Sequence, residues 1–174
     1  MKAKGRDVQL VICGLGGQGT IFLTRLLAEA AMLEGREVLT AETHGMAQRG
    51  GAVQSHVKIG EFSGSTVRRG RADAALVLDA GRVEAGQAFL RPQGACFVNA
   101  EGALPLLRSC DATAAATQRG LPRGANLVLF GFARASEPDL FPARAALLEA
   151  LDRLSPKGLG EHNRMAFEAG EALS

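Results

Sequence analysis

The stretch ICGLGGQGT, residues 12–20, contains the residues whose spacing most directly suggests chemistry. Gly14, Gly16 and Gly19 follow an apolar run in the order G-x-G-x-x-G. In a dinucleotide-binding fold these glycines allow a tight turn and a close approach of the backbone to a pyrophosphate at a helix amino end. Glu42 stands about 20 residues further on, where an acidic residue would hold the ribose hydroxyls. The pattern alone is equally consistent with NAD or FAD binding and with another use of the glycines.

A second polar segment, ETHGMAQRGG at residues 42–51, combines an acid, a histidine and an arginine with paired glycines. Gly50 and Gly51 permit unusual backbone angles and the close approach of a ligand or another chain. Arg49 offers a bidentate fork for a phosphate or a carboxylate. His44 is the one candidate for a general acid or base, although a hydrogen-bonded loop histidine is the favoured interpretation.

The other histidines and the cysteines give no metal-ligand spacing. We expect His56 on the polar face of a strand and His162 at the exposed start of the last helix. Cys13, Cys96 and Cys110 are odd in number and far apart, so each is interpreted as a small core hydrophobe rather than a cluster ligand.

Length and composition restrict the function classes. The chain has 174 residues, 47% hydrophobic residues and a formal net charge of +2, which fits a single domain over residues 1–174 and gives no argument for nucleic acid. Arg68, Arg69 and Arg71 form the dense basic cluster, which we interpret as a solvated turn or a subunit contact. No apolar stretch approaches the ~20 residues needed to span a bilayer, and no leader is recognisable, so a cytoplasmic location is expected.

The apolar pattern predicts the elements that would position these loops. A strand at 8–13, a helix at 20–34 and a strand at 36–42 form a βαβ unit, whose right-handed crossover implies a parallel sheet. Residues 52–60 alternate between apolar and polar types, which predicts an added antiparallel strand with one wetter face. Residues 72–80 are continuously apolar, as in a strand buried on both faces.

The second half of the chain completes the same architecture. Residues 124–136 suit a strand by content and a helix by length, so their class stays open. The other expected elements are a short helix stopped by Pro92, strands at 94–102 and 104–113, a helix at 112–120, a helix at 136–154 capped by Ser136, and a last helix at 161–173. Together they predict a three-layer α/β/α, Rossmann-like fold with a mostly parallel sheet and an antiparallel addition.

Both motifs together carry a family resemblance. GLGGQGTIFLTRLLAEAAMLEG at 14–35, followed by AETHGMAQRGGAVQSHVKIG at 41–60, resembles the gamma-type domain of the 2-oxoacid:ferredoxin oxidoreductases. HGMAQRGG looks most like the beta subunits of the indolepyruvate enzymes. Later segments agree, among them ANLVLFGF and PKGLGEHNRMAFEAG, so the resemblance covers nearly the whole chain.

The resemblance implies a subunit that supports oxidative decarboxylation of a 2-oxoacid to an acyl-coenzyme A, with electrons passing to ferredoxin. Thiamine diphosphate and iron–sulfur clusters would belong to a large partner subunit, ferredoxin would be an indirect partner, and this chain would contact coenzyme A without firmly holding a cofactor. The isolated chain would be inactive and free to homodimerise. The residues expected to meet a phosphate-bearing ligand or the partner are Gly14, Gly16, Gly17, Gln18, Gly19, Glu42, Arg49, Gly50 and Gly51.

Two other readings stay open at this point. One is a stand-alone NAD(P)- or FAD-binding oxidoreductase built on the glycine fingerprint. The other is an interaction module in which the glycine turn only packs a helix against a strand. Because residues 105–113 are short compared with the aryl-specific subunits, the 2-oxoacid itself is also left open.

Overall fold

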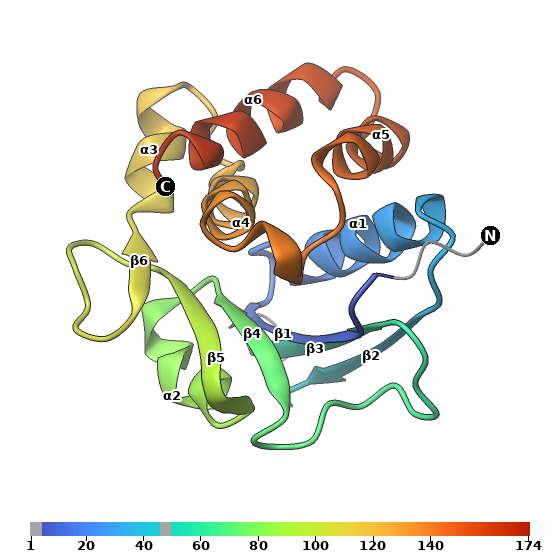
Figure 1. Ribbon diagram of the computed structural model, residues 1–174. Helices are drawn as coiled ribbons and strands as arrows, with labels where there is room; N and C mark the ends of the chain where they lie inside the picture. Colours follow the sequence, from blue (N-terminus) through green and yellow to red (C-terminus); the bar gives the residue numbers. More distant parts are fainter. Residues whose placement is uncertain (1–4, 46–49) are drawn as a thin grey trace.

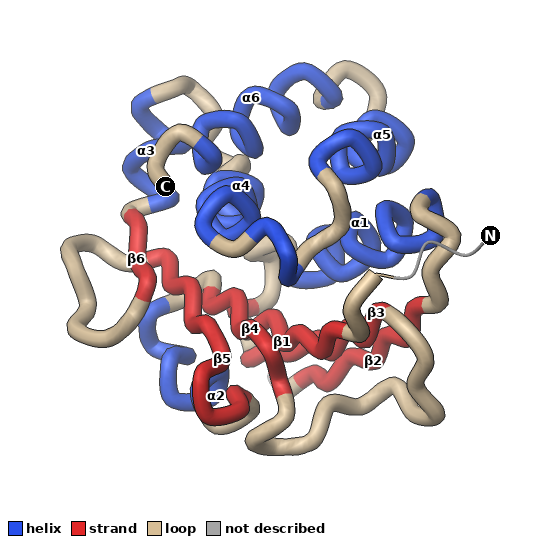
Figure 2. Tube along the Cα trace, in the orientation of Figure 1, coloured by secondary structure: helices blue, strands red, loops and turns tan. Residues whose placement is uncertain are grey.

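The computed structural model describes residues 5–45 and 50–174, which form a six-stranded mixed sheet in the order β2-β3-β1-β4-β5-β6 (Figure 2). The strands are β1 (Val8–Leu15), β2 (Val38–His44), β3 (Ala52–Ile59), β4 (Ala72–Val77), β5 (Leu90–Asn99) and β6 (Arg108–Cys110). The helices are α1 (Thr20–Leu33), α2 (Val83–Gln87), α3 (Ala112–Gln118), α4 (Ala125–Ser136), α5 (Arg144–Leu154) and α6 (Gly160–Glu171).

The sheet separates two helical layers of unequal thickness. α1, α3, α4, α5 and α6 lie on one side, and α2 lies on the other (Figure 1). β4 is parallel to β1 and β5, and β5 is parallel to β6, whereas β3 is antiparallel to β1 and β2. The predicted three-layer α/β fold, with its mostly parallel sheet and antiparallel addition, is therefore confirmed.

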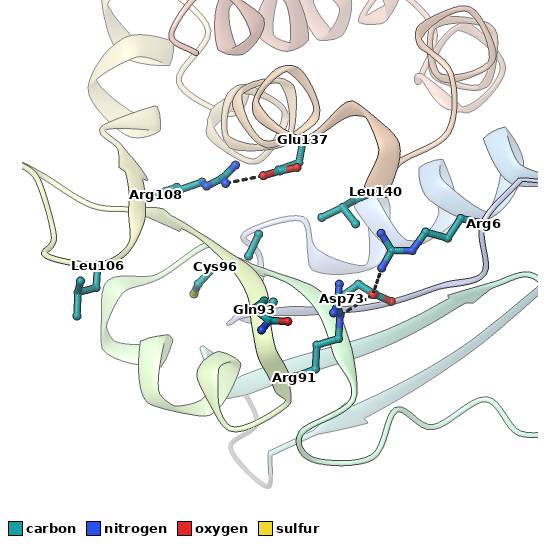
Figure 3. Close-up of a pocket in the computed structure, with 11 residues that line it drawn as sticks. Arg6, Asp73, Arg91, Gln93, Cys96, Leu106, Arg108, Glu137 and Leu140 are labelled. Carbon is teal, nitrogen blue, oxygen red and sulfur yellow. Dashed lines mark hydrogen bonds and ion pairs between the residues drawn. The ribbon is translucent and has the colours of Figure 1, made fainter.

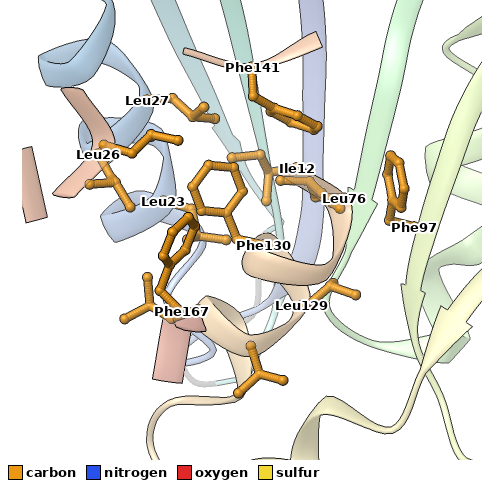
Figure 4. Close-up of a cluster of buried hydrophobic side chains, with 14 of the residues drawn as sticks. Ile12, Leu23, Leu26, Leu27, Leu76, Phe97, Leu129, Phe130, Phe141 and Phe167 are labelled. Atoms are coloured by element: carbon orange, nitrogen blue, oxygen red, sulfur yellow. The ribbon is translucent and has the colours of Figure 1, made fainter. Parts of the chain in front are cut away.

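Alternation along the strands supplies the core. In β1, Leu10 and Ile12 face the thick helical layer, while Val11 faces the α2 side. Ile12 meets Leu23 and Leu27 of α1 and Phe130 of α4 in the main cluster (Figure 4). α1 packs against both the sheet and α5, so its apolar surface is buried on two sides, although Ile21 and Met32 stay exposed.

The βαβ unit has an inserted strand. β1 and β2 run in the same direction, as the crossover predicts, but β3 lies between them. β2 ends on exposed polar residues, Glu42 and His44, which suit an edge position because one of its sides meets solvent. The carboxyl ends of β1 and β2 therefore point to the same edge of the sheet, where β3 begins.

Two sequence-based boundaries around proline and serine are wrong. α2 ends at Gln87, and Pro92 lies inside β5, where the register with β4 shifts and an amide hydrogen is not needed. Ser136 is the last residue of α4, and its Oγ donates to the carbonyl of Phe132 instead of capping the next helix. α5 begins only at Arg144, because the extended Phe141 precedes a proline.

The open segment 124–136 is the helix α4, which is buried against β4, β5 and α6. Its uniform apolar content reflects burial on several sides, which hides the helical period. The predicted wetter face of β3 is also wrong: His56 is only 2% exposed and Lys58 is 9% exposed. The loop at 60–71 covers them, and the backbone N–H of Val67 donates to Nδ1 of His56 over 3.3 Å.

Candidate functional site

Gln18 holds the glycine turn between β1 and α1. Its backbone N–H donates to the carbonyl of Leu15 over 3.1 Å, and its side-chain oxygen accepts from the N–H of Leu15 over 2.7 Å. Its Nε2 lies 3.4 Å from a carboxylate oxygen of Asp79, just beyond β4. Gln18 thus fixes the turn from both sides, a role that the glycine spacing does not reveal.

The two glycine-rich segments of the sequence meet in space. The N–H of Gly16 donates to the carbonyl of Gly51 over 2.9 Å, and the N–H of Gly45 donates to the carbonyl of Ala52 over 2.7 Å. Gly50 lies against Gly16, since a Cβ placed on Gly16 would stand 3.5 Å from the backbone nitrogen of Gly50. The turn after β1 and the entry to β3 therefore form one backbone surface.

The other residues predicted from the second segment lie at the edge of that surface. Glu42 and His44 are exposed residues of β2, and Oε2 of Glu42 is 3.6 Å from Nε2 of His44. His44 belongs to a strand, so the loop-histidine interpretation is wrong in its location, and its candidate acid–base role stays a prediction. Arg49 lies outside the described residues.

A cavity of about 360 Å³ opens beside the glycine turn. It lies at the carboxyl ends of β4 and β5, the edge at which open α/β sheets bind ligands. Gly17 and Gln18 of the turn border it. Its further lining residues are Leu78, Asn99, Thr113, Pro122, Arg123, Ala125 and Asn126.

Asn99, Thr113, Arg123 and Asn126 were not identified from the sequence. Asn99 and Thr113 hold each other, because Nδ2 of Asn99 donates to Oγ1 of Thr113 over 2.9 Å. Asn126 borders the glycine turn, and a Cβ at Gly19, whose φ is +87°, would collide with its amide. Arg123 is exposed and forms no ion pair with another described residue. The sequence signal that could have identified Arg123 is its position next to Gly124, just before the apolar run that forms α4.

Two helix amino ends meet at this cavity. α1 begins after Gly19 and α4 begins after Gly124, and neither glycine supplies a side-chain cap, although Oδ1 of Asn126 accepts from the N–H of Leu127 in the first turn of α4 over 2.9 Å. Free N–H groups and the helix dipoles at such ends favour an anion. The hydroxyl of Thr20, in a residue only 3% exposed, has no hydrogen-bond partner among the described residues, but it lies against Gly14 and does not line the cavity. With Arg123 at the rim, the cavity has the donor set of a phosphate site.

A second hollow lies at the opposite end of the strands and contains paired charges. One oxygen of Asp73 accepts from both Arg6 and Arg91 at 2.8 Å, and Arg108 pairs with Glu137 (Figure 3). Because its carboxylates already hold its arginines, this hollow acts as a structural ion network. The carboxyl-edge cavity is therefore the candidate ligand site.

The cysteines behave as core residues. Cys13 and Cys96 are buried, Cys110 is half-buried, and none forms a disulfide. Burial raises the pKa of each thiol to about 11, which disfavours the thiolate needed for metal ligation. This confirms their interpretation as small hydrophobes. Across residues 5–45 and 50–174, no helix is long and apolar enough to cross a bilayer. The cytoplasmic location stays a prediction.

Comparison with known proteins defines the class. The chain belongs to the pyruvate ferredoxin/flavodoxin oxidoreductase family, whose model matches residues 9–173. It is similar to the indolepyruvate oxidoreductase subunit IorB of Archaeoglobus fulgidus, with 38% identity over 56% of this chain and 49% of that protein. The IorB of Methanothermobacter thermautotrophicus is 44% identical over 42% of this chain and 37% of that protein. The matched part of the chain thus spans about half the length of these relatives or less.

Solved structures agree on the fold. The gamma subunit of a keto/oxoacid ferredoxin oxidoreductase from Geobacter sulfurreducens has a TM-score of 0.77 and 27% identity, covering 94% of this chain and 95% of that chain. A 2-oxoglutarate:ferredoxin oxidoreductase from Magnetococcus marinus, solved with 2-oxoglutarate, coenzyme A and succinyl-CoA bound, has a TM-score of 0.78 at 20% identity. That match covers 98% of this chain and 31% of the other, and it supports the fold alone.

Proposed function

We propose that this chain is the gamma-type, non-thiamine-binding subunit of a 2-oxoacid:ferredoxin oxidoreductase of the indolepyruvate or arylpyruvate type. Residues 1–174 would form the single gamma-type domain. Family membership and the similarity to two IorB subunits support the class. The proposed complex oxidatively decarboxylates a 2-oxoacid, passes electrons to ferredoxin and releases an acyl-coenzyme A.

In this proposal the redox cofactors reside on a large partner subunit, which binds thiamine diphosphate and iron–sulfur clusters, and ferredoxin is an indirect partner. The cysteines support that division, because Cys96 belongs to the α2-side core and the buried Cys13 lies beside Gly86 of α2, so neither is at a surface that receives a cluster. The gamma-type chain contributes a binding surface. The glycine turn, with Gly16 bonded to Gly51, supplies that surface at the carboxyl edge of the sheet.

We propose coenzyme A as the ligand that this edge contacts, and its thiol would carry the acyl group away. The fit rests on the starts of α1 and α4, whose N-cap residues supply no side-chain cap, and on Arg123 at the rim, which forms no ion pair with another described residue. The helix ends would bind a phosphate through backbone N–H groups, and Arg123 would neutralise its charge. Gln18 and Asn126 would orient the turn around it. The contacts expected of Glu42, Arg49 and the paired glycines stay predictions.

The observation that carries this proposal is the meeting of the glycine turn with the amino end of α4 at one cavity. In the complex with its partner subunit, Arg123→Ala should raise the Kd for coenzyme A about 10-fold, the effect of losing one charge-assisted hydrogen bond. Arg119→Ala is the matched control, because Arg119 is exposed on the neighbouring segment and does not line the cavity. Equal affinities in the two variants would contradict this assignment.

The stand-alone NAD(P)- or FAD-binding alternative finds no support in the comparisons. It would require saturable binding of NADH, NADPH or FAD to the isolated chain, and a flat titration would exclude it. The interaction-module reading differs from our proposal at Arg49. Arg49→Ala would leave assembly and activity unchanged in that reading, whereas our proposal expects one of them to fall.

A further inference from the structure

A larger cavity lies on the α2 side of the sheet, beneath the loop at 60–71. It has a volume of about 820 Å³, and Lys58 of β3 and Gln9 of β1 border it. Lys58 pairs with Gln9, near the amino end of β1, whereas the glycine turn follows the carboxyl end of that strand. This cavity is therefore separate from the proposed coenzyme A site.

Lys58 lies at the floor of this cavity, which is an unusual place for a charged side chain. Its residue is only 9% exposed, and its ammonium group lies 5.2 Å from the ring centre of Phe62. It forms no ion pair with any carboxylate in residues 5–45 or 50–174. Because Lys58 lines the cavity and has no carboxylate partner in the described chain, its ammonium group is available to an anion that enters.

Two more cations border the same space without partners. Arg68 and Arg71 are exposed and, like Lys58, form no ion pair within the described part of the chain. Asp73, two residues after Arg71, is already held by two arginines and by the N–H of Gln9. Asp7 accepts from the N–H of Glu61 over 3.4 Å, and neither Asp7 nor Glu61 lines the cavity.

Hydroxyl groups complete the donor set. Ser63, Ser65 and Thr66 of the loop line the cavity beside the cations, and none of the described residues that line it is acidic. Three positive charges with hydroxyl and amide donors form the chemistry that recognises the oxygens of a phosphate. Because Lys58 is only 9% exposed, a small molecule that enters the cavity can reach its ammonium group, whereas a flat protein surface cannot.

We propose that the Lys58–Arg68–Arg71 cavity is a binding site for a small phosphate-bearing molecule, distinct from the carboxyl-edge site. The ligand's phosphate would meet Lys58 at the floor and the two arginines at the rim. It would also order the loop at 60–71, whose hydroxyls surround it.

Hydrogen exchange on the full chain, with inorganic pyrophosphate as the probe at constant ionic strength, tests this site. We expect saturable protection of amides at 60–71, and at least a 10-fold weaker affinity in Arg68→Ala/Arg71→Ala, which removes two charged contacts. Arg123→Ala should leave this protection unchanged, which separates it from binding at the carboxyl edge. Arg25→Ala/Arg119→Ala removes the same net charge from exposed arginines elsewhere and should also leave it unchanged.

Thermal unfolding gives a second measurement. In the Arg123→Ala background, which weakens the carboxyl-edge site, pyrophosphate should raise the Tm, and adding Lys58→Met, which keeps the length of the side chain and removes its charge, should abolish that rise. Three results would overturn the proposal. The first is no saturable protection of amides at 60–71, and the second is an equal loss of pyrophosphate affinity in Arg25→Ala/Arg119→Ala. The third is loss of partner assembly in Arg68→Ala/Arg71→Ala with pyrophosphate binding intact. The last result would identify the arginines as a protein contact.

Discussion

The backbone N–H of Gly16 donates a 2.9 Å hydrogen bond to the carbonyl oxygen of Gly51. This bond joins the turn after β1 to the entry of β3, two segments with a helix and a strand between them in sequence. The two glycine-rich motifs are therefore one structural unit. Their chemistry depends on a shared backbone surface, beside which the cavity of the carboxyl edge opens.

Substitution at Gly16 tests that close approach. A Cβ there would stand 3.5 Å from the nitrogen of Gly50, an ordinary contact, so Gly16→Ala should change the free energy of unfolding by less than about 1 kcal/mol. Gly16→Val adds two carbons against the facing backbone and should cost about 1–3 kcal/mol. Denaturant unfolding of both variants measures the difference. If valine were tolerated as well as alanine, the two loops would not be in firm contact.

The crossing of α4 and α6 depends on two glycines. A Cβ at Gly131 would collide with the carbonyl oxygen of Phe167, and a Cβ at Gly170 would collide with that of Val128. Since backbone cannot move aside as a flexible side chain can, Gly131→Ala should destabilise the protein by about 3 kcal/mol or more. Gly160→Ala, at the open start of α6, is the control and should be nearly neutral. Equal unfolding free energies would contradict the packing described.

His56 should make stability depend on pH. Burial, and then the positive charge of Lys58, lower the pKa of His56 below its ordinary 6.5 in the folded state. The unfolded state therefore binds the proton first, so this contribution to stability is complete above about pH 6.5 and is lost as the pH falls below it. Tm measured from pH 7.5 to pH 5 should decline, and His56→Gln should flatten that decline. The exposed His162→Gln is the control, and it should retain the wild-type slope.

The sequence predicted those elements whose local pattern agrees with their final environment. β1 is a continuous apolar run that ends in a glycine turn, and α1 is followed by Gly35, which ends the helix, so the positions of both elements follow from local chemistry. α4 could not be distinguished from a strand, because neighbours on several sides remove its polar face. His56 was misplaced because its cover is the aperiodic loop at 60–71.

The candidate site was predicted only in part, for a similar reason. The glycines and Gln18 belong to a recognisable local motif, whereas Arg123 and Asn126 reach the cavity only through the packing of α4. No spacing rule relates Asn126 to Gly19, although the two residues are in contact. Local motifs thus revealed one wall of the cavity, and the tertiary fold supplied the other.

Reconstitution with a candidate thiamine-binding subunit from the same organism tests the central proposal most directly. The assay is the coenzyme A-dependent reduction of ferredoxin by an arylpyruvate, measured for each subunit alone and for the two combined. We predict a stable complex that is active only when both chains are present. Full activity of the large subunit alone, together with failure of the chains to associate, would contradict the proposed function.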